Sequence, residues 1–113
     1  MATLIGRKKV KTAVFISGAG SNLKKIIKFS KLKYSPISVD LIISNNPKSK
    51  GLRYAKIFMI KKKIFDFKKS TLAEKKILKI LKKDQINLIC LAGFMKILSK
   101  DFIQNFKGKI LNI

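Results

Sequence analysis

Histidine and tryptophan are absent from this sequence of 113 residues, and cysteine occurs only once, at Cys90. A single cysteine cannot form an internal disulfide, and without histidine the usual ligand set of a zinc site is missing. We therefore predict no bound metal. A reaction that needs an imidazole cannot be carried out by these residues alone.

Acidic residues are also scarce, since 5 Asp and Glu stand against 27 Lys and Arg, for a formal net charge of +22. Such a charge is common in disordered chains, but 47% of the residues are apolar and form dense blocks that can build a core. All the basic residues except Arg7 and Arg53 are lysine, and isoleucine is abundant. This bias favours the compositional drift of an AT-rich genome over selection for a polyanionic partner, although a positive field still attracts phosphorylated metabolites and nucleic acids.

Long apolar runs are missing as well. The N-terminal segment, residues 1–11, contains only the short apolar pair Leu4-Ile5, so it lacks the core of a secretory signal. No stretch approaches the roughly 18 to 20 apolar residues of a membrane span. We interpret residues 1–11 as a basic extension, expect no membrane partner, and predict a cytoplasmic protein with one small domain.

What the sequence does contain is an alternation of apolar runs and amphipathic stretches. The apolar runs predict strands at 12–17, 37–43, 58–60, 86–92 and 109–113. The amphipathic stretches predict helices that begin near Ser21, at 51–57, behind Thr71 and at 101–106, and Thr71-x-x-Glu74 is interpreted as a capping box. This order predicts the α/β class: a Rossmann-like, mostly parallel sheet with helices on both faces and ligands at the carboxyl ends of its strands.

A glycine-containing turn, from Ser17 to Asn22, follows the first predicted strand. Gly18 and Gly20 permit positive φ and close approach of a ligand to the backbone, and the free N–H groups of the helix behind them suit a phosphate. The third glycine of a dinucleotide fingerprint is missing and Ser44-Asn45-Asn46 stands where an acidic residue is expected, which argues against a dehydrogenase. From these residues alone, a tight capped turn without a ligand explains the pattern equally well.

Longer motifs carry a resemblance to a known family. They are Ser17-Gly-Ala-Gly-Ser-Asn-Leu23, Leu91-Ala-Gly-Phe-Met-Lys-Ile-Leu-Ser99 and Ile110-Leu-Asn-Ile113. In this order and at these separations they resemble the motifs of the phosphoribosylglycinamide formyltransferases, and Ser44-Asn45 and Gly51-Leu52 agree between them. The resemblance runs from about residue 12 to the last residue. It implies that residues 12–113 form the N-terminal, nucleotide-binding half of the formyltransferase fold.

The resemblance also implies roles for single residues. It gives the phosphate of 5'-phosphoribosylglycinamide to the first loop, the co-substrate 10-formyltetrahydrofolate to the second motif, and the oxyanion of the tetrahedral intermediate to an asparagine amide. The residues implied are Gly20, Ser21 and Asn22 for the phosphate, Met95, Lys96, Ile97, Leu98 and Asn112 for the folate, and Asn112 for catalysis. Core packing is an equal alternative for Ile97 and Leu98. A further basic folate residue of the family falls near Lys69 or Ser70, without a fixed position.

The family's catalytic histidine, two residues beyond the asparagine, and a later aspartate have no counterpart in these 113 residues. We therefore expect an inactive N-terminal fragment, truncated at its C-terminus, of an enzyme that transfers the formyl group to the glycinamide amine in de novo purine (IMP) biosynthesis. Its expected partners are the two small-molecule substrates.

Two alternatives stay open. Methionyl-tRNA formyltransferase and formyltetrahydrofolate deformylase use the same co-substrate. From a different class, the charge alone favours a small basic nucleic-acid-binding protein. The Phe and Tyr residues lie mostly within apolar strand and helix patterns and are not interleaved with arginine, so no specific nucleic-acid partner is expected.

Overall fold

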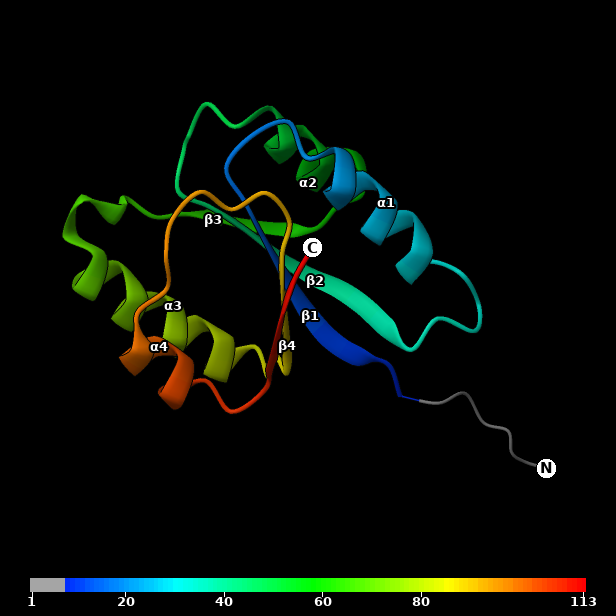
Figure 1. Ribbon diagram of the computed structural model, residues 1–113. Coiled ribbons are helices and arrows are strands. Elements are labelled where there is room, and N and C mark those ends of the chain that lie inside the picture. Colours follow the sequence, from blue (N-terminus) through cyan, green and yellow to red (C-terminus); the bar gives the residue numbers. More distant parts are fainter. Residues whose placement is uncertain (1–7) are drawn as a thin grey trace.

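Five parallel strands form the centre of the computed structural model, which describes residues 8–113 (Figure 1). Most of the predicted basic extension, residues 1–7, lies outside the described residues. The strands are β1 (Val10–Ile16), β2 (Ile37–Ser44), β3 (Lys61–Ile64), β4 (Leu88–Leu91) and β5 (Lys109–Asn112). Their order across the sheet is β3-β2-β1-β4-β5, and every neighbouring pair is parallel. The predicted Rossmann-like α/β fold is confirmed.

The central strand β1 is apolar on both of its faces. Ala13, Val14, Phe15 and Ile16 are fully buried, as expected for a strand of a parallel sheet that helices cover on both sides. The strand begins two residues earlier than predicted, because Val10 already pairs with β2.

Four helices cover the two faces of the sheet. Helices α1 and α2 lie on one face and α3 and α4 on the other (Figure 1). The helices are α1 (Ser21–Ser30), α2 (Arg53–Ile57), α3 (Ser70–Lys83) and α4 (Lys100–Asn105), with short 3₁₀ turns at Lys50–Leu52 and Phe67–Lys69. The sequence predicted all four helices. Within residues 8–113, none of them has the length and apolar character needed to cross a bilayer.

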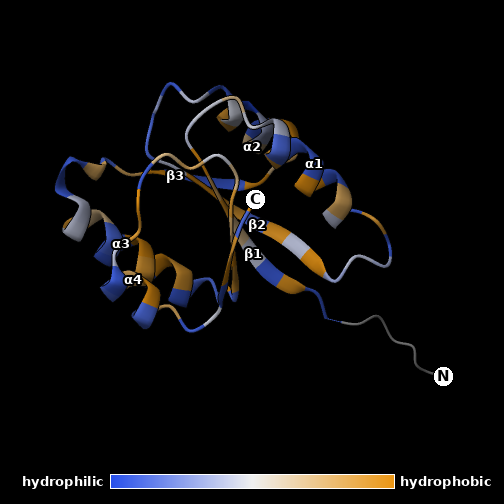
Figure 2. Ribbon diagram, in the orientation of Figure 1, coloured by the Kyte–Doolittle hydropathy of each residue, from blue (hydrophilic) through white to orange (hydrophobic). Residues whose placement is uncertain are grey.

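Apolar side chains at helical spacing join these helices to the sheet. Leu23 and Ile27 of α1 pack on one side, and Ile77 and Leu81 of α3 pack on the other. Figure 2 shows apolar stretches along β1 and β2, hydrophilic residues in β3, and a mixture of apolar and hydrophilic residues along α1 and α3. The lysines of α1 and α3 therefore stay on the solvent side, and the core forms in spite of the high charge.

The chain changes faces after β3, so the strand order reverses beside β1. The segment that follows β1 leads to α1 on one face, whereas the segment that follows β4 leads to α4 on the opposite face. The two segments diverge at the carboxyl ends of neighbouring strands. In open α/β sheets this divergence creates a crevice in which ligands bind.

The third strand differs from the prediction. It was expected at residues 58–60, but Phe58 ends α2, Met59 has a positive φ of 54°, and β3 is the lysine-rich segment Lys61–Ile64. Every residue of β3 is exposed, and the strand pairs on one side only, with β2. Lysines suit such an edge because they discourage pairing with another chain, so the strand lacks the apolar run that marks a buried one.

The predicted capping box is also wrong. Helix α3 begins at Ser70, and its N-cap residue Lys69 makes no side-chain capping hydrogen bond. Thr71 lies within the first turn. Glu74 is buried and accepts hydrogen bonds from Ser99, far along the chain, and not from the start of its own helix.

Candidate functional site

The candidate site lies between the segments that follow β1 and β4, where the strand order of the sheet predicts a ligand crevice. The last main-chain hydrogen bond between these strands runs from the Ala92 N–H to the Phe15 carbonyl, at 2.9 Å. Beyond it lie the loop 17–20, which leads into α1, and the segment 93–99, which leads into α4. These are the two segments in which the sequence predicted phosphate-binding and folate-binding residues.

The loop 17–20 is held by backbone contacts with the β2–α2 connection. Gly20 has φ +76°, and a Cβ added to it would lie 2.8 Å from the Cα of Gly51. The Gly18 carbonyl accepts hydrogen bonds from the Ser49 hydroxyl at 2.6 Å and from the Gly51 N–H at 2.9 Å. These contacts restrain the loop, and its conformation requires glycine at position 20. Gly18 is not in the positive-φ region, and a Cβ there would meet no atom within 4 Å.

Helix α1 begins directly behind this loop. Its N-cap residue Gly20 supplies no side-chain capping bond, and the first main-chain bond of the helix runs from the Lys24 N–H to the Gly20 carbonyl, at 2.9 Å. Ser21 and Asn22, the next two residues, are exposed. An uncapped helix start with exposed N–H groups and a positive dipole end offers donors to an anion such as phosphate.

The segment 93–99 presents apolar side chains to solvent. Met95 is 78% exposed and Ile97 is 92% exposed, and Lys96 between them is exposed as well. Leu98 is buried and packs in the core cluster that includes Phe102. The core-packing alternative therefore describes Leu98 and is wrong for Ile97.

Side-chain hydrogen bonds fix this segment at both ends. Near its start, the Met95 N–H donates to Ser17 Oγ at 2.8 Å. At its end, the Ser99 N–H and hydroxyl donate to the two oxygens of Glu74, at 2.7 and 2.6 Å. Because both ends are tied to neighbouring elements, the backbone between them is restrained, and we call the exposed side chains that it carries, Met95, Lys96 and Ile97, the platform.

Contacts between aromatic rings also hold the same segment in place. Phe94 meets Phe15 and Phe67 edge to face, each with its ring centroid 5.4 Å away. Sequence reasoning missed the supporting roles of Ser17, Glu74 and Phe94. Two signals in the sequence mark such residues: Ser17 lies within the first motif, and Glu74 is an acidic residue next to the apolar positions of a lysine-rich helix. Neither signal identifies the distant residue with which the side chain forms a hydrogen bond.

Asn112 lies at the same edge of the sheet. It pairs with Leu91 at the carboxyl end of β4, and its side chain is exposed. An exposed amide at the carboxyl edge is suitably placed to donate to a ligand in the crevice.

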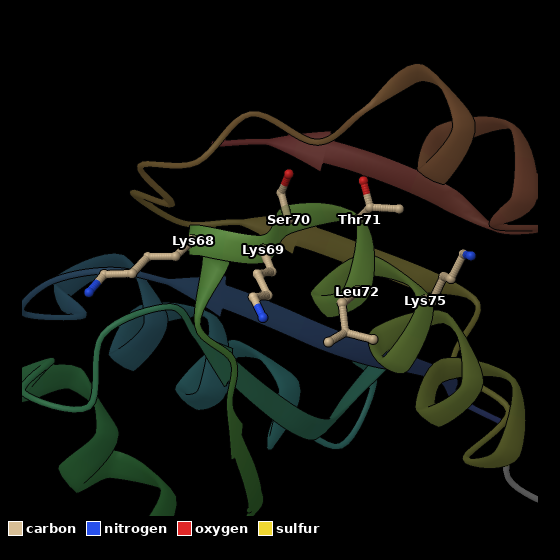
Figure 3. A pocket seen from close by; sticks show the side chains of 6 residues that line it. All are labelled: Lys68, Lys69, Ser70, Thr71, Leu72 and Lys75. Atoms are coloured by element: carbon tan, nitrogen blue, oxygen red, sulfur yellow. The ribbon is translucent and has the colours of Figure 1, made fainter.

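A surface pocket of about 450 Å³ opens at the start of α3 (Figure 3). Figure 3 shows the Ser70 and Thr71 hydroxyls directed to one side of the helix and Lys69 and Leu72 to the other. Lys68 and Lys75 complete its lining. The contacts of Glu74 with Ser99 and of Phe67 with Phe94 bring this end of α3 beside the segment 93–99. Both positions considered for a further folate residue, 69 and 70, therefore line one basic pocket.

The other reactive groups in the described part of the chain, residues 8–113, do not form a second candidate site. Burial raises the pKa of the Cys90 thiol, so the thiol stays protonated and is a poor nucleophile. Residues 8–113 hold no group of three His, Cys, Asp or Glu side chains that could bind a metal ion.

Known proteins match this chain along nearly its whole length. The family model described as formyl transferase matches residues 10–113. The trifunctional purine biosynthetic protein adenosine-3 of Gallus gallus is 41% identical over 108 residues, which are 93% of this chain and 11% of that protein. The phosphoribosylglycinamide formyltransferase of Haemophilus influenzae is 40% identical over 106 residues, which are 91% of this chain and 50% of that protein.

Solved structures agree with these matches. The crystal structure of phosphoribosylglycinamide formyltransferase from Brucella melitensis superposes with a TM-score of 0.88 at 32% identity. The superposition covers 93% of this chain and 56% of that chain. The chain thus spans about half the length of the single-function proteins it matches and about a tenth of the trifunctional one.

Proposed function

Because the chain belongs to the formyl transferase family, whose model matches residues 10–113, we propose that it carries the ribonucleotide- and folate-binding half of a phosphoribosylglycinamide formyltransferase. The reaction moves the formyl group of 10-formyltetrahydrofolate to the amine of 5'-phosphoribosylglycinamide, a step of purine biosynthesis in the cytoplasm. A C–N bond to the glycinamide amine forms, the bond to the folate nitrogen breaks, and one proton passes from the amine to the folate.

One observation carries the proposal: the three motifs of the resemblance meet at one edge of the sheet. The loop 17–20, the segment 93–99 and Asn112 all lie at the carboxyl ends of β1, β4 and β5. A phosphate site, an apolar platform and an amide donor side by side are what a transfer between a phosphorylated substrate and a folate requires.

The phosphate of the ribonucleotide binds at Gly20, Ser21 and Asn22. The uncapped N–H groups of α1 donate to its oxygens, and the dipole of the ten-residue helix favours its charge. The net charge of +22 adds attraction for a phosphorylated ligand at longer range.

The folate binds along Met95, Lys96, Ile97 and Leu98, next to Asn112. Exposed Met95 and Ile97 supply apolar contact area for its ring, and buried Leu98 anchors the segment from behind. Lys96 stands where the family more often has arginine. Lysine keeps the positive charge but gives up the planar, bidentate donor geometry.

Asn112 stabilises the oxyanion of the tetrahedral intermediate. A single preorganised donor of this kind is typically worth about 10²–10³ in rate. No histidine is present in the 113 residues to move the proton from the attacking amine. The 113-residue polypeptide therefore binds both substrates without turning them over.

The experiment is to titrate the purified 113-residue chain with each substrate by calorimetry and then to assay formyl transfer. We expect binding of both substrates and no transfer above the uncatalysed rate. The Asn112→Ala variant is expected to bind the ribonucleotide like the unchanged chain, because β4 separates β5, which carries Asn112, from β1, which leads into the phosphate loop. Turnover equal to that of a full-length relative would contradict the proposal, as would salt-dependent binding of random DNA without any binding of the ribonucleotide.

A further inference from the structure

The hydroxyl of Ser17 lies where three loops meet. It donates to Oδ1 of Asn45, which follows β2, and it accepts the N–H of Met95, which follows β4, at 2.8 Å. Ser17 itself follows β1 and is buried, with 9% of its surface exposed. The single donor and one acceptor position of the hydroxyl are thus both engaged with groups outside its own loop.

Within residues 8–113, this is the only hydrogen bond that joins the loop 17–20 to the segment 93–99. The main-chain ladder between β1 and β4 ends at the Ala92 N–H. The other partners of the loop 17–20, Ser49 and Gly51, lie on the α1 side of the crevice, and Glu74, the other tether of the segment 93–99, lies on the α3 side. The bond from Ser17 to Met95 is therefore the direct polar link between the two segments, beside the apolar contact of Phe15 with Phe94.

We propose that Ser17 is a positioning residue that couples the phosphate loop to the folate platform, an inference that rests on the proposed function. A ribonucleotide bound at Gly20, Ser21 and Asn22 restrains the loop that begins at Ser17. Through the hydroxyl, the same restraint reaches the Met95 N–H and holds the platform ready for the folate. Each substrate then strengthens the binding of the other by the same factor.

Two measurements on the 113-residue chain test this role. The first is hydrogen exchange of the Met95 amide, followed by NMR without any ligand. The second is the ratio of the folate dissociation constants measured without and with saturating ribonucleotide, a ratio that a merely structural defect would leave unchanged. We expect the ribonucleotide to tighten folate binding about fivefold in the unchanged chain, at the lower end of typical couplings.

Ser17→Ala removes the hydroxyl and is expected to bring this ratio close to one, with about tenfold faster exchange at Met95 because the amide then opens to water. Ser30→Ala is the matched control. Its hydroxyl is also buried and makes one hydrogen bond, to the Ile27 carbonyl at 2.6 Å, but at the far end of α1. This variant should keep both the ratio and the Met95 exchange rate of the unchanged chain.

Should Ser17→Ala fail to fold, Asn45→Ala gives the second test. It frees the hydroxyl to rotate while leaving Ser17 in place, and we expect the same changes at smaller size. Unchanged Met95 exchange, or an unchanged ratio, in a folded variant would overturn the proposal. If the unchanged chain binds neither substrate, the proposed function fails, and the ligand-free exchange rate at Met95 still decides whether Ser17 fixes the platform.

Discussion

Both the positive φ of Gly20 and the close approach of Gly51 require glycine at position 20. Gly93 shares the positive φ but has no such close neighbour. Gly20 has φ +76°, and a Cβ there would lie 2.8 Å from the backbone of Gly51. Gly93 has nearly the same φ, +73°, but a Cβ there would meet nothing within 4 Å. Comparing the two alanine variants therefore separates the cost of the backbone conformation from the cost of the collision.

We predict that Gly93→Ala lowers the free energy of unfolding by about 1 kcal/mol, which is the usual cost of a non-glycine residue in this region. Gly20→Ala should lower it by at least about 2 kcal/mol and also weaken ribonucleotide binding, because the phosphate loop must move away from Gly51. Urea unfolding and calorimetry measure the two effects. Gly18→Ala, with neither constraint, is the control, and equal losses for the variants at 20 and 93 would contradict the argument.

The carboxylate of Glu74 is a second residue with a defined task. It is buried in a lysine-rich helix and accepts two hydrogen bonds from Ser99, which in turn caps α4 through the Phe102 N–H at 3.1 Å. The carboxylate therefore helps to hold both the end of the segment 93–99, the proposed folate platform, and the start of α4.

Glu74→Gln replaces one acceptor oxygen by a donor group. We predict a loss of about 1–2 kcal/mol in unfolding free energy, since hydrogen bonds to charged groups are among the stronger ones, together with weaker folate binding. Asp84→Asn is the matched change at the surface: it weakens the partly exposed bond to Lys61, at 2.9 Å, and should cost well under about 1 kcal/mol. Urea unfolding of both variants measures these losses. A smaller loss of unfolding free energy for Glu74→Gln than for Asp84→Asn would contradict the prediction.

At the scale of elements, the sequence was sufficient to predict the strands and helices whose apolar residues are buried. The run from Ala13 to Ile16 and the helical spacing of Leu23 and Ile27 reflect packing against the sheet, so they predicted β1 and α1. The edge strand β3 buries none of its residues, and its pairing with β2 comes from backbone bonds that leave no mark in the side chains. A pattern of buried positions cannot reveal an element of that kind.

Within the candidate site, too, some features could be predicted from the sequence and others could not. The loop 17–20 and the segment 93–99 were recognised from local strings, and parallel topology brings the ends of their strands together. The ties of Ser17 to Met95 and of Glu74 to Ser99 span 78 and 25 residues, respectively. Hydrogen bonds over such separations depend on the folded topology, and Thr71-x-x-Glu74 suggested a local bond that competes with the one actually formed.

At the scale of the whole molecule, charge and fold act on different properties. The five-stranded scaffold places the site, while the net charge of +22 surrounds it with a positive potential. Both proposed substrates are anions, so this potential raises the rate at which they arrive and part of their affinity. Interactions of this range are screened by salt, since the Debye length is about 10 Å at 0.1 M and about 3 Å at 1 M.

We therefore predict that the dissociation constant of the ribonucleotide rises about tenfold or more between 0.05 and 0.5 M salt, because screening removes the long-range attraction. The same nucleoside without its phosphate should show little change. Lys79→Gln together with Lys83→Gln lowers the charge on the exposed face of α3 without touching the crevice, and should weaken the salt dependence only slightly. Calorimetry over a salt series measures all three. An affinity that does not respond to salt would mean that the bonds at Gly20, Ser21 and Asn22 alone hold the phosphate and that the lysine surplus contributes nothing to binding.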